Sequence, residues 1–146
     1  SVTVTVNGKK ISANYYRLYY KNNRNSGIGT VQVRGNGKYS RINQTLTFQI
    51  LPSKTSVTGV KTSGRSFTAS WKKNIQATGY QIQYAADSGF TKERKTVTAG
   101  KQNVTSYKVS RLKSKKTYYV RIRSYKKAGK TVLYSGWSAV KKVKIS

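Results

Sequence analysis

The sequence contains no cysteine, histidine or methionine, and its only acidic side chains are Asp87 and Glu93. The absence of cysteine excludes a disulfide framework and leaves the redox compartment open. General acid–base catalysis draws mostly on His, Asp and Glu, and metal sites need clusters of His, Cys or carboxylates. Serine and lysine are abundant, but no pattern places one serine on a strained nucleophile turn. We therefore predict a chain that is not an enzyme and that has no cofactor and no metal site.

Long apolar runs are also absent. No stretch approaches the ~20 apolar residues that a membrane-spanning helix needs, so we expect no membrane insertion. The first residues show no charged segment followed by an apolar one, and we expect any secretory signal to have been removed or to lie outside this fragment. Proline occurs once, at Pro52. Because proline cannot donate a hydrogen bond to a sheet, Leu51-Pro52-Ser53 is the natural domain boundary.

Positive charge is in large excess. The chain has 30 Lys and Arg residues against 2 Asp and Glu, for a formal net charge of +28. Such a balance favours polyanions, bound ionically and in a salt-sensitive way. The alternative is a solubilising surface in which lysine replaces the usual acids. We expect an anionic cell-wall polymer or glycan as partner and consider nucleic acid unlikely, because no groove-binding helix or nucleic-acid motif is recognisable.

Apolar and polar residues alternate with a period of two along most of the chain, which predicts β-strands and no helix. The fold class is therefore all-β, with two small β-sandwich modules in tandem at residues 1–51 and 52–146. An Asn7-Gly8 pair predicts a hairpin turn in the first module. The predicted strands cover residues 1–6, 14–21, 29–34 and 44–50, and then 55–61, 66–72, 79–85, 95–99, 104–110, 117–126 and 140–146.

Residues 117–125, TYYVRIRSY, show the alternation most clearly. We expect the inward-facing side chains of this stretch to lie in the core, whereas its outward-facing side chains include aromatic and guanidinium groups. We predict that Tyr118 donates its hydroxyl hydrogen to the backbone near Leu112. Phe90 is expected to tuck under the loop at residues 86–93. The residues predicted to be buried are Trp71, Tyr80, Ile82, Leu112, Tyr118, Val120 and Ile122.

The second module resembles a fibronectin type III domain. The resemblance rests on Trp71 in FTASWKK, on GYQIQYA at residues 79–85, on Leu112 and Tyr118, and on SGWS at residues 135–138. It implies an immunoglobulin-like sandwich with a tyrosine corner. In some receptor domains of this type the Trp–Ser motif interleaves with arginines, which implies Trp137 over Arg121 or Arg123.

The first module resembles a β-rich repeat of surface proteins in gut Firmicutes. The matching pieces are NGK, YKNN, GTVQV, GNGKY and TFQI, within residues 7–50. Such repeats often begin with a further strand, which is absent here. The resemblance implies a bacterial protein that is secreted or held at the cell surface, in which this chain adjoins other domains.

Two surfaces are candidate binding sites. Aromatic rings between cations suit stacking on sugars or bases with charge alongside. The alternative for the first surface is a cation–π ladder that joins two strands, and for the second it is cross-strand packing. The first surface, a polyanion or glycan face, comprises Tyr119, Arg121, Arg123, Tyr125, Lys142 and Lys144, and the second comprises Tyr15 and Tyr19.

The expected function is that of a non-catalytic structural or presenting module that contacts anionic cell-wall polymers. The alternative is a carbohydrate-binding or adhesion module that uses exposed Tyr and Arg side chains on a sheet face.

Overall fold

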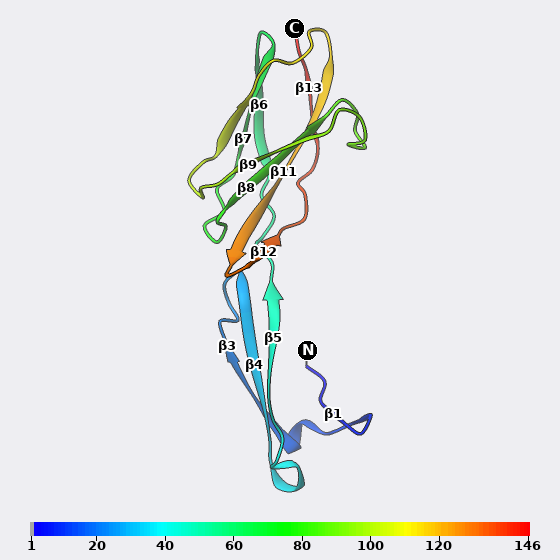
Figure 1. Ribbon diagram of the computed structural model, residues 1–146, viewed down its shortest axis with the longest axis vertical. Coiled ribbons are helices and arrows are strands. Elements are labelled where there is room, and N and C mark those ends of the chain that lie inside the picture. The colour runs from blue at the N-terminus through cyan, green and yellow to red at the C-terminus, as the bar shows by residue number, and fades with distance from the viewer. Residues whose placement is uncertain (1) are drawn as a thin grey trace. The chain divides into compact units, whose positions relative to one another are not determined.

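The computed structural model describes residues 2–146 and divides into two compact units (Figure 1). The first unit runs to Arg24 and includes Ile28–Ile50, and the second comprises Asn25–Gly27 and Leu51–Ser146. Strands account for the regular structure of both, apart from the short 3-10 turns η1 (Ala13–Tyr15) and η2 (Gly37–Tyr39). The predicted all-β fold is confirmed. Within the described part of the chain, we find no helix with the length and apolar character to cross a membrane.

The first unit contains a hairpin and a three-stranded antiparallel sheet. The hairpin joins β1 (Thr5–Val6) to β2 (Lys9–Lys10), and its turn residues Asn7 and Gly8 have φ of 48° and 75°. The predicted strand over residues 1–6 is therefore shorter than expected, and Ser1 lies outside the described residues. The sheet has the order β3 (Tyr16–Lys21), β4 (Gly27–Gly35) and β5 (Asn43–Ile50).

Alternation assigns the faces of this sheet. Tyr16 and Val33 are buried on one face, where they pack with Ile11. The opposite face carries Arg17 and Tyr19, which are exposed. The strand predicted over residues 14–21 begins two residues late, because Ser12 accepts a hydrogen bond from the Asn14 amide (3.4 Å) and caps η1. Local side-chain capping therefore competes with strand pairing at this point.

The second unit is a sandwich of two sheets (Figure 1). One sheet has the order β10 (Ser106–Val109), β7 (Ser66–Trp71) and β6 (Val57–Ser63). In the other, β9 (Lys95–Ala99) pairs with β8 (Gly79–Ala85), which pairs with β11 (Thr117–Ala128). The free edge of β11 pairs with β12 (Thr131–Tyr134) towards its end and with β13 (Lys141–Lys144) near its start. The sequence did not predict β12, whose four residues are short for a recognisable alternation.

The core of the sandwich lies between the sheets. Each of the seven residues predicted to be buried is at most 5% exposed, so that prediction is confirmed. Tyr80 is fully buried and its hydroxyl accepts from the Asn74 amide (2.8 Å) and donates to the Gln102 carbonyl (3.0 Å). The Tyr118 hydroxyl accepts from the Lys113 amide (3.2 Å), so the expected donation to the backbone was wrong in direction.

Candidate functional site

Arginine side chains of β11 alternate with aromatic rings in a stack of five members, here named the β11 ladder. Its order is Phe90, Arg121, Trp137, Arg123 and Tyr134. The Arg121 Cζ atom lies 3.9 Å from the Phe90 ring centroid and 4.7 Å from that of Trp137. The Arg123 Cζ atom lies 4.4 Å from Trp137 and 3.9 Å from Tyr134. Both guanidinium groups are therefore held between two rings by cation–π contacts.

Glutamines of β8 fix these guanidinium groups from the neighbouring strand. Arg121 pairs in register with Gln83, and Arg123 with Gln81. Arg121 donates to Gln83 Oε1 from Nε (2.9 Å) and Nη2 (2.6 Å), and Arg123 donates to Gln81 Oε1 over 2.9 and 2.7 Å. Burial lowers the pKa of Arg121, and the nearby charges of Arg94 and Arg123 lower it further. Arg121 nevertheless stays charged, because guanidinium groups do not lose their proton in proteins.

Two serines attach the segment between β12 and β13 to β11. The Ser135 amide donates to the Ser124 carbonyl (2.9 Å), and its hydroxyl oxygen accepts from the Ser124 amide (3.0 Å). Ser138 does the same with Ile122, at 2.7 and 3.0 Å. Each serine therefore satisfies both backbone groups of a β11 residue in place of a strand partner. Trp137, which lies between the serines in the sequence, is thereby placed within the β11 ladder.

A loop organised by Asp87 supplies the Phe90 end of the ladder. The Asp87 carboxylate accepts from the Lys92 amide (2.7 Å), the Thr91 amide (3.0 Å) and the Thr91 hydroxyl (2.8 Å). These hydrogen bonds, above all that from Lys92, lower the pKa of Asp87. Phe90 has φ of 58°, which is rare for a residue with a side chain, and its ring is 1% exposed. The expected burial of Phe90 is confirmed, and its place against Arg121 is a contact that the sequence did not predict.

The first candidate surface is therefore only partly free. Arg121 and Arg123 are half-buried in the ladder. Tyr125, expected on the outward surface, is 5% exposed, and this expectation was wrong. Its ring covers Gly79, where a Cβ atom would lie 2.9 Å from the Tyr125 hydroxyl oxygen, so the missing side chain of glycine makes room for it. Tyr119 is half-buried opposite Lys142, and Lys142 and Lys144 are exposed.

The second candidate pair is not brought together. Tyr15 belongs to η1 and meets Tyr39 edge-on at 5.4 Å between ring centroids, with Lys38 Nζ 5.4 Å from the Tyr15 centroid. Tyr19 lies on the open face of the β3–β4–β5 sheet, is 50% exposed, and has the Arg34 Cζ atom 5.3 Å from its ring centroid. Only Tyr19 therefore presents a ring on the sheet face.

Residues 51–141 match the family described as Fibronectin type III domain. The chain belongs to the fibronectin type III family. The expected sandwich resemblance of the second module is thereby confirmed, and the resemblance of residues 1–51 to a surface-protein repeat remains a prediction. Fibronectin type III domains are generally non-enzymatic structural or binding modules, typical of extracellular or surface proteins.

Solved structures agree with the fold. One is described as "Myokine structure", with a TM-score of 0.52 and 15% identity, over 64% of this chain and 97% of that one. Another, the FN1-FN3 domains of chicken CNTN1, has a TM-score of 0.51 and 20% identity, over 84% of this chain and 42% of that one.

A Kelch domain-containing protein of Saccharolobus solfataricus is similar in sequence: it is 33% identical over 86 residues, which are 59% of this chain. The chain spans only 11% of the length of that relative.

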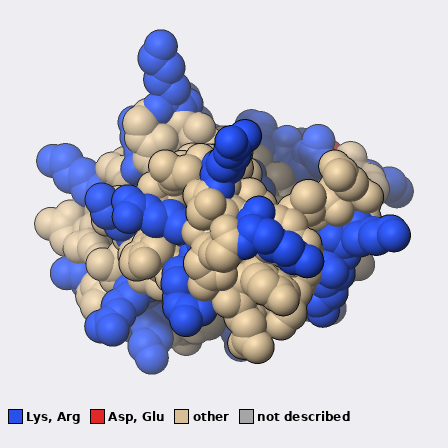
Figure 2. Space-filling model, turned by 90° about the horizontal axis from the view of Figure 1, so that it is seen from below, with Lys and Arg blue, Asp and Glu red and all other residues tan. Residues whose placement is uncertain are grey.

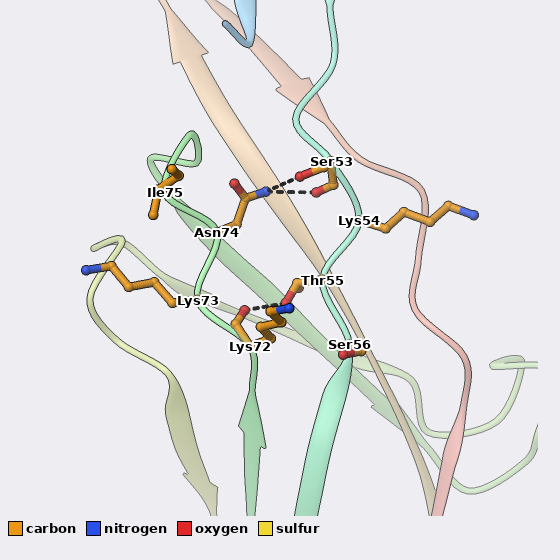
Figure 3. Close-up of a pocket in the computed structure, with 8 residues that line it drawn as sticks. All are labelled: Ser53, Lys54, Thr55, Ser56, Lys72, Lys73, Asn74 and Ile75. Carbon is orange, nitrogen blue, oxygen red and sulfur yellow. Dashed lines mark hydrogen bonds between the residues drawn. The ribbon is translucent and has the colours of Figure 1, made fainter.

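The fibronectin type III domain has a surface groove of about 570 Å³ where the chain enters β6 and leaves β7 (Figure 3). Asn74 is buried there and donates from Nδ2 to the Ser53 carbonyl (2.8 Å) and hydroxyl (3.1 Å). Figure 3 shows the Lys54 and Lys73 ammonium groups extending to opposite sides. The side-chain amide of Asn74 is used in hydrogen bonds within the chain, and these hold the segment that leads into β6. Because the ammonium groups of Lys54 and Lys73 also diverge, the groove does not form a convergent binding site.

Acidic groups are too few to neutralise the surface. Glu93 Oε1 accepts from Lys116 Nζ (2.5 Å) and Lys113 Nζ (3.2 Å), contacts that lower the pKa of Glu93. Across residues 2–146, these are the only lysine or arginine side chains that form a salt bridge with a carboxylate. The same residues contain no cluster of three or more potential metal ligands. Figure 2 shows lysine and arginine side chains projecting over the whole face in view, with scarcely any acidic atoms among them.

Proposed function

We propose that the chain is a non-catalytic structural and presenting module of a bacterial secreted or surface protein, and that it associates with anionic cell-wall polymers through its charge. One observation carries the proposal. A net charge of +28 is opposed by Asp87, which is engaged within its own loop, and by Glu93, which is shared by two lysines. The remaining cations of the described residues have no carboxylate partner, and apart from Arg121 and Arg123, which the β11 ladder engages, they are available to an external polyanion.

The outward face of the β6–β7–β10 sheet illustrates this availability. Lys61 and Lys108 are exposed on either side of Thr68, with which both pair in register. Adjacent strands lie about 4.8 Å apart, so the two backbone positions are separated by roughly 10 Å. No aromatic ring covers these lysines, in contrast to the arginines of the β11 ladder. This face therefore offers charge without a shaped pocket.

Mutual repulsion among the cations destabilises the compact state, and a polyanion that binds the folded chain stabilises it by mass action. The melting temperature should therefore rise when teichoic acid or heparin is added at low salt. Retention on an anionic column should fall steeply as salt increases, because counterion release dominates this kind of binding.

Two double variants test whether the association is diffuse. K61Q/K108Q and K142Q/K144Q remove equal charge from the opposite sheets, and all four lysines are exposed. We expect both to reduce retention and the salt slope by similar amounts. Absence of binding at low salt would refute the polyanion association and leave the spacer role. Strong binding that is independent of salt would show a specific pocket instead.

A carbohydrate-binding or adhesion function is the second candidate. The half-exposed ring of Tyr19 beside Arg34 supports it, because aromatic rings on flat sheets stack on sugar rings.

A further inference from the structure

The open face of β3 and β4 combines one free ring with several unpaired cations. Along β3, Arg17, Tyr19 and Lys21 point to the same side and all are exposed. On β4, Arg34 lies opposite Arg17 and Gln32 lies opposite Tyr19. We call these five residues the Tyr19 face. Residues two apart on a strand are about 6.8 Å apart, so the ring and the arginine pair occupy successive rows.

The arginine pair has an electrostatic cost that nothing in the described residues relieves. Like charges directly opposite each other on paired strands are destabilising. Arg17 donates from Nη1 to the Tyr16 carbonyl (3.2 Å), and no carboxylate contacts either guanidinium in residues 2–146. An anion bound between Arg17 and Arg34 would remove this repulsion, and guanidinium groups bind planar carboxylates in a bidentate manner.

The Tyr19 face differs from the β11 ladder in the features that make the ladder structural. In the ladder every guanidinium lies between two rings and is bonded to a glutamine. Arg34 contacts one ring, that of Tyr19, at 5.3 Å, and the ring stays 50% exposed. Gln32 donates from Nε2 to Asn43 Oδ1 (2.8 Å), and in the described residues no hydrogen bond joins it to either arginine. One face of the tyrosine ring and the outer edges of both guanidinium groups are therefore open to a ligand.

We infer that the Tyr19 face binds a polysaccharide built from uronic acid residues. A uronic acid carries a sugar ring and a carboxylate in one unit, which matches a stacking ring in one row and an arginine pair in the next. Lys21, on the far side of Tyr19, would meet the carboxylate of a following unit. This inference rests on the proposed association with polyanions and names the ligand class for one surface.

Single-stranded nucleic acid fits this surface less well. Proteins that bind such strands stack successive bases on several aromatic side chains. Tyr15 precedes Tyr19 by four residues, so alternation alone would put the two rings on the same face. Tyr15 instead belongs to η1 and packs edge-on against Tyr39. A single open ring between cations favours an acidic sugar over a run of bases.

The experiment measures binding of the whole 146-residue chain to polygalacturonate, to inorganic polyphosphate, to single-stranded DNA and to neutral dextran at low salt. Polyphosphate carries charge without sugar rings, and dextran carries rings without charge. Y19S should weaken polygalacturonate binding about 5- to 10-fold, because it removes the ring on which the sugar stacks, and should leave polyphosphate binding unchanged. Y19F should bind both polymers like the parent chain, because it keeps the ring.

Tyr20 provides the matched control. It is 44% exposed, neighbours Tyr19 on β3, and faces the other side of the sheet, where it meets Phe48 edge-on at 6.4 Å. Y20S should therefore leave polygalacturonate binding unchanged. R17Q/R34Q should weaken polygalacturonate binding more than polyphosphate binding, and its circular dichroism should match that of the parent chain.

The outcomes separate the inference from the proposed function. If the chain binds neither anionic polymer, the proposed polyanion association fails. If it binds both and Y19S weakens neither, or weakens both equally, the uronic acid inference alone is overturned. Tighter binding of single-stranded DNA than of polygalacturonate, lost in Y19S, would also overturn it in favour of a nucleic-acid surface.

Discussion

Replacing Tyr80 by phenylalanine should destabilise the fibronectin type III domain far more than the same change at Tyr118. The Tyr80 ring is fully buried and lies 5.5 Å from Trp71 between centroids. Its hydroxyl accepts from the buried Asn74 amide (2.8 Å) and donates to the Gln102 carbonyl (3.0 Å). The Tyr118 hydroxyl makes one longer bond, from the Lys113 amide (3.2 Å).

The hydrogen bonds give the expected magnitudes. Each ordinary hydrogen bond contributes about 1 kcal/mol net, and a buried donor left without a partner costs about 1–3 kcal/mol. Y80F removes both bonds and leaves the Asn74 amide unpaired, so it should cost about 2–4 kcal/mol. Y118F should cost about 1 kcal/mol. For a domain of roughly this size, 1 kcal/mol corresponds to about 4–8 °C in melting temperature.

Urea denaturation of the whole chain tests the comparison. Tryptophan fluorescence reports on Trp71, which is buried against Tyr80, and on Trp137 in the β11 ladder. Far-ultraviolet circular dichroism provides a second probe. We expect unchanged m-values and a lower midpoint for Y80F, with Y118F between it and the parent chain. Equal losses in the two variants, or a larger loss in Y118F, would show that the number and burial of these hydrogen bonds do not set the stability.

Two further predictions concern the β11 ladder and the response to acid. W137A removes the ring between Arg121 and Arg123 and should lower the free energy of unfolding by about 2–3 kcal/mol, measured by urea denaturation. W137F should recover part of this stability. A loss below about 0.5 kcal/mol in W137A would contradict the structural role of the ladder. The pKa values of Asp87 and Glu93 are lowered in the folded chain from ordinary values of 3.8 and 4.5. Their contribution to stability is therefore complete above these values and is lost only as the pH falls below them through the folded pKa values. The urea midpoint should be flat from pH 7 to about pH 5 and should begin to fall below about pH 4.5, the ordinary value of Glu93. A fall near pH 6 would contradict this assignment.

The sequence predicted the core better than the surface. Period-two alternation determines which side chains of a strand share a face, and burial of Tyr118, Val120 and Ile122 follows once that face is apolar. The same rule placed Tyr125 outside, where the structure buries it. The reason is a neighbour distant in the sequence, since Gly79 pairs with Tyr125 and leaves room for its ring.

The ladder shows the same division. The resemblance of SGWS to a Trp–Ser motif implied Trp137 over Arg121 or Arg123, and the structure shows that Trp137 contacts both. Phe90 and Tyr134, the ends of the stack, were not assigned to it, because nothing in their local sequence relates the β8–β9 loop and β12 to the face of β11. Their roles depend on backbone geometry, including the positive φ of Phe90 and the hydrogen bonds of Asp87.

By itself, the sequence determined the all-β fold, the residues of the sandwich core and the excess of positive charge, because alternation and composition are local properties of the chain. Only the tertiary structure decided which cations are free. It places Arg121 and Arg123 between rings and glutamines, and leaves Arg17 and Arg34 facing each other beside the open ring of Tyr19. The physical reason is that the availability of a charge depends on cross-strand neighbours, and strand register brings these together from distant parts of the chain.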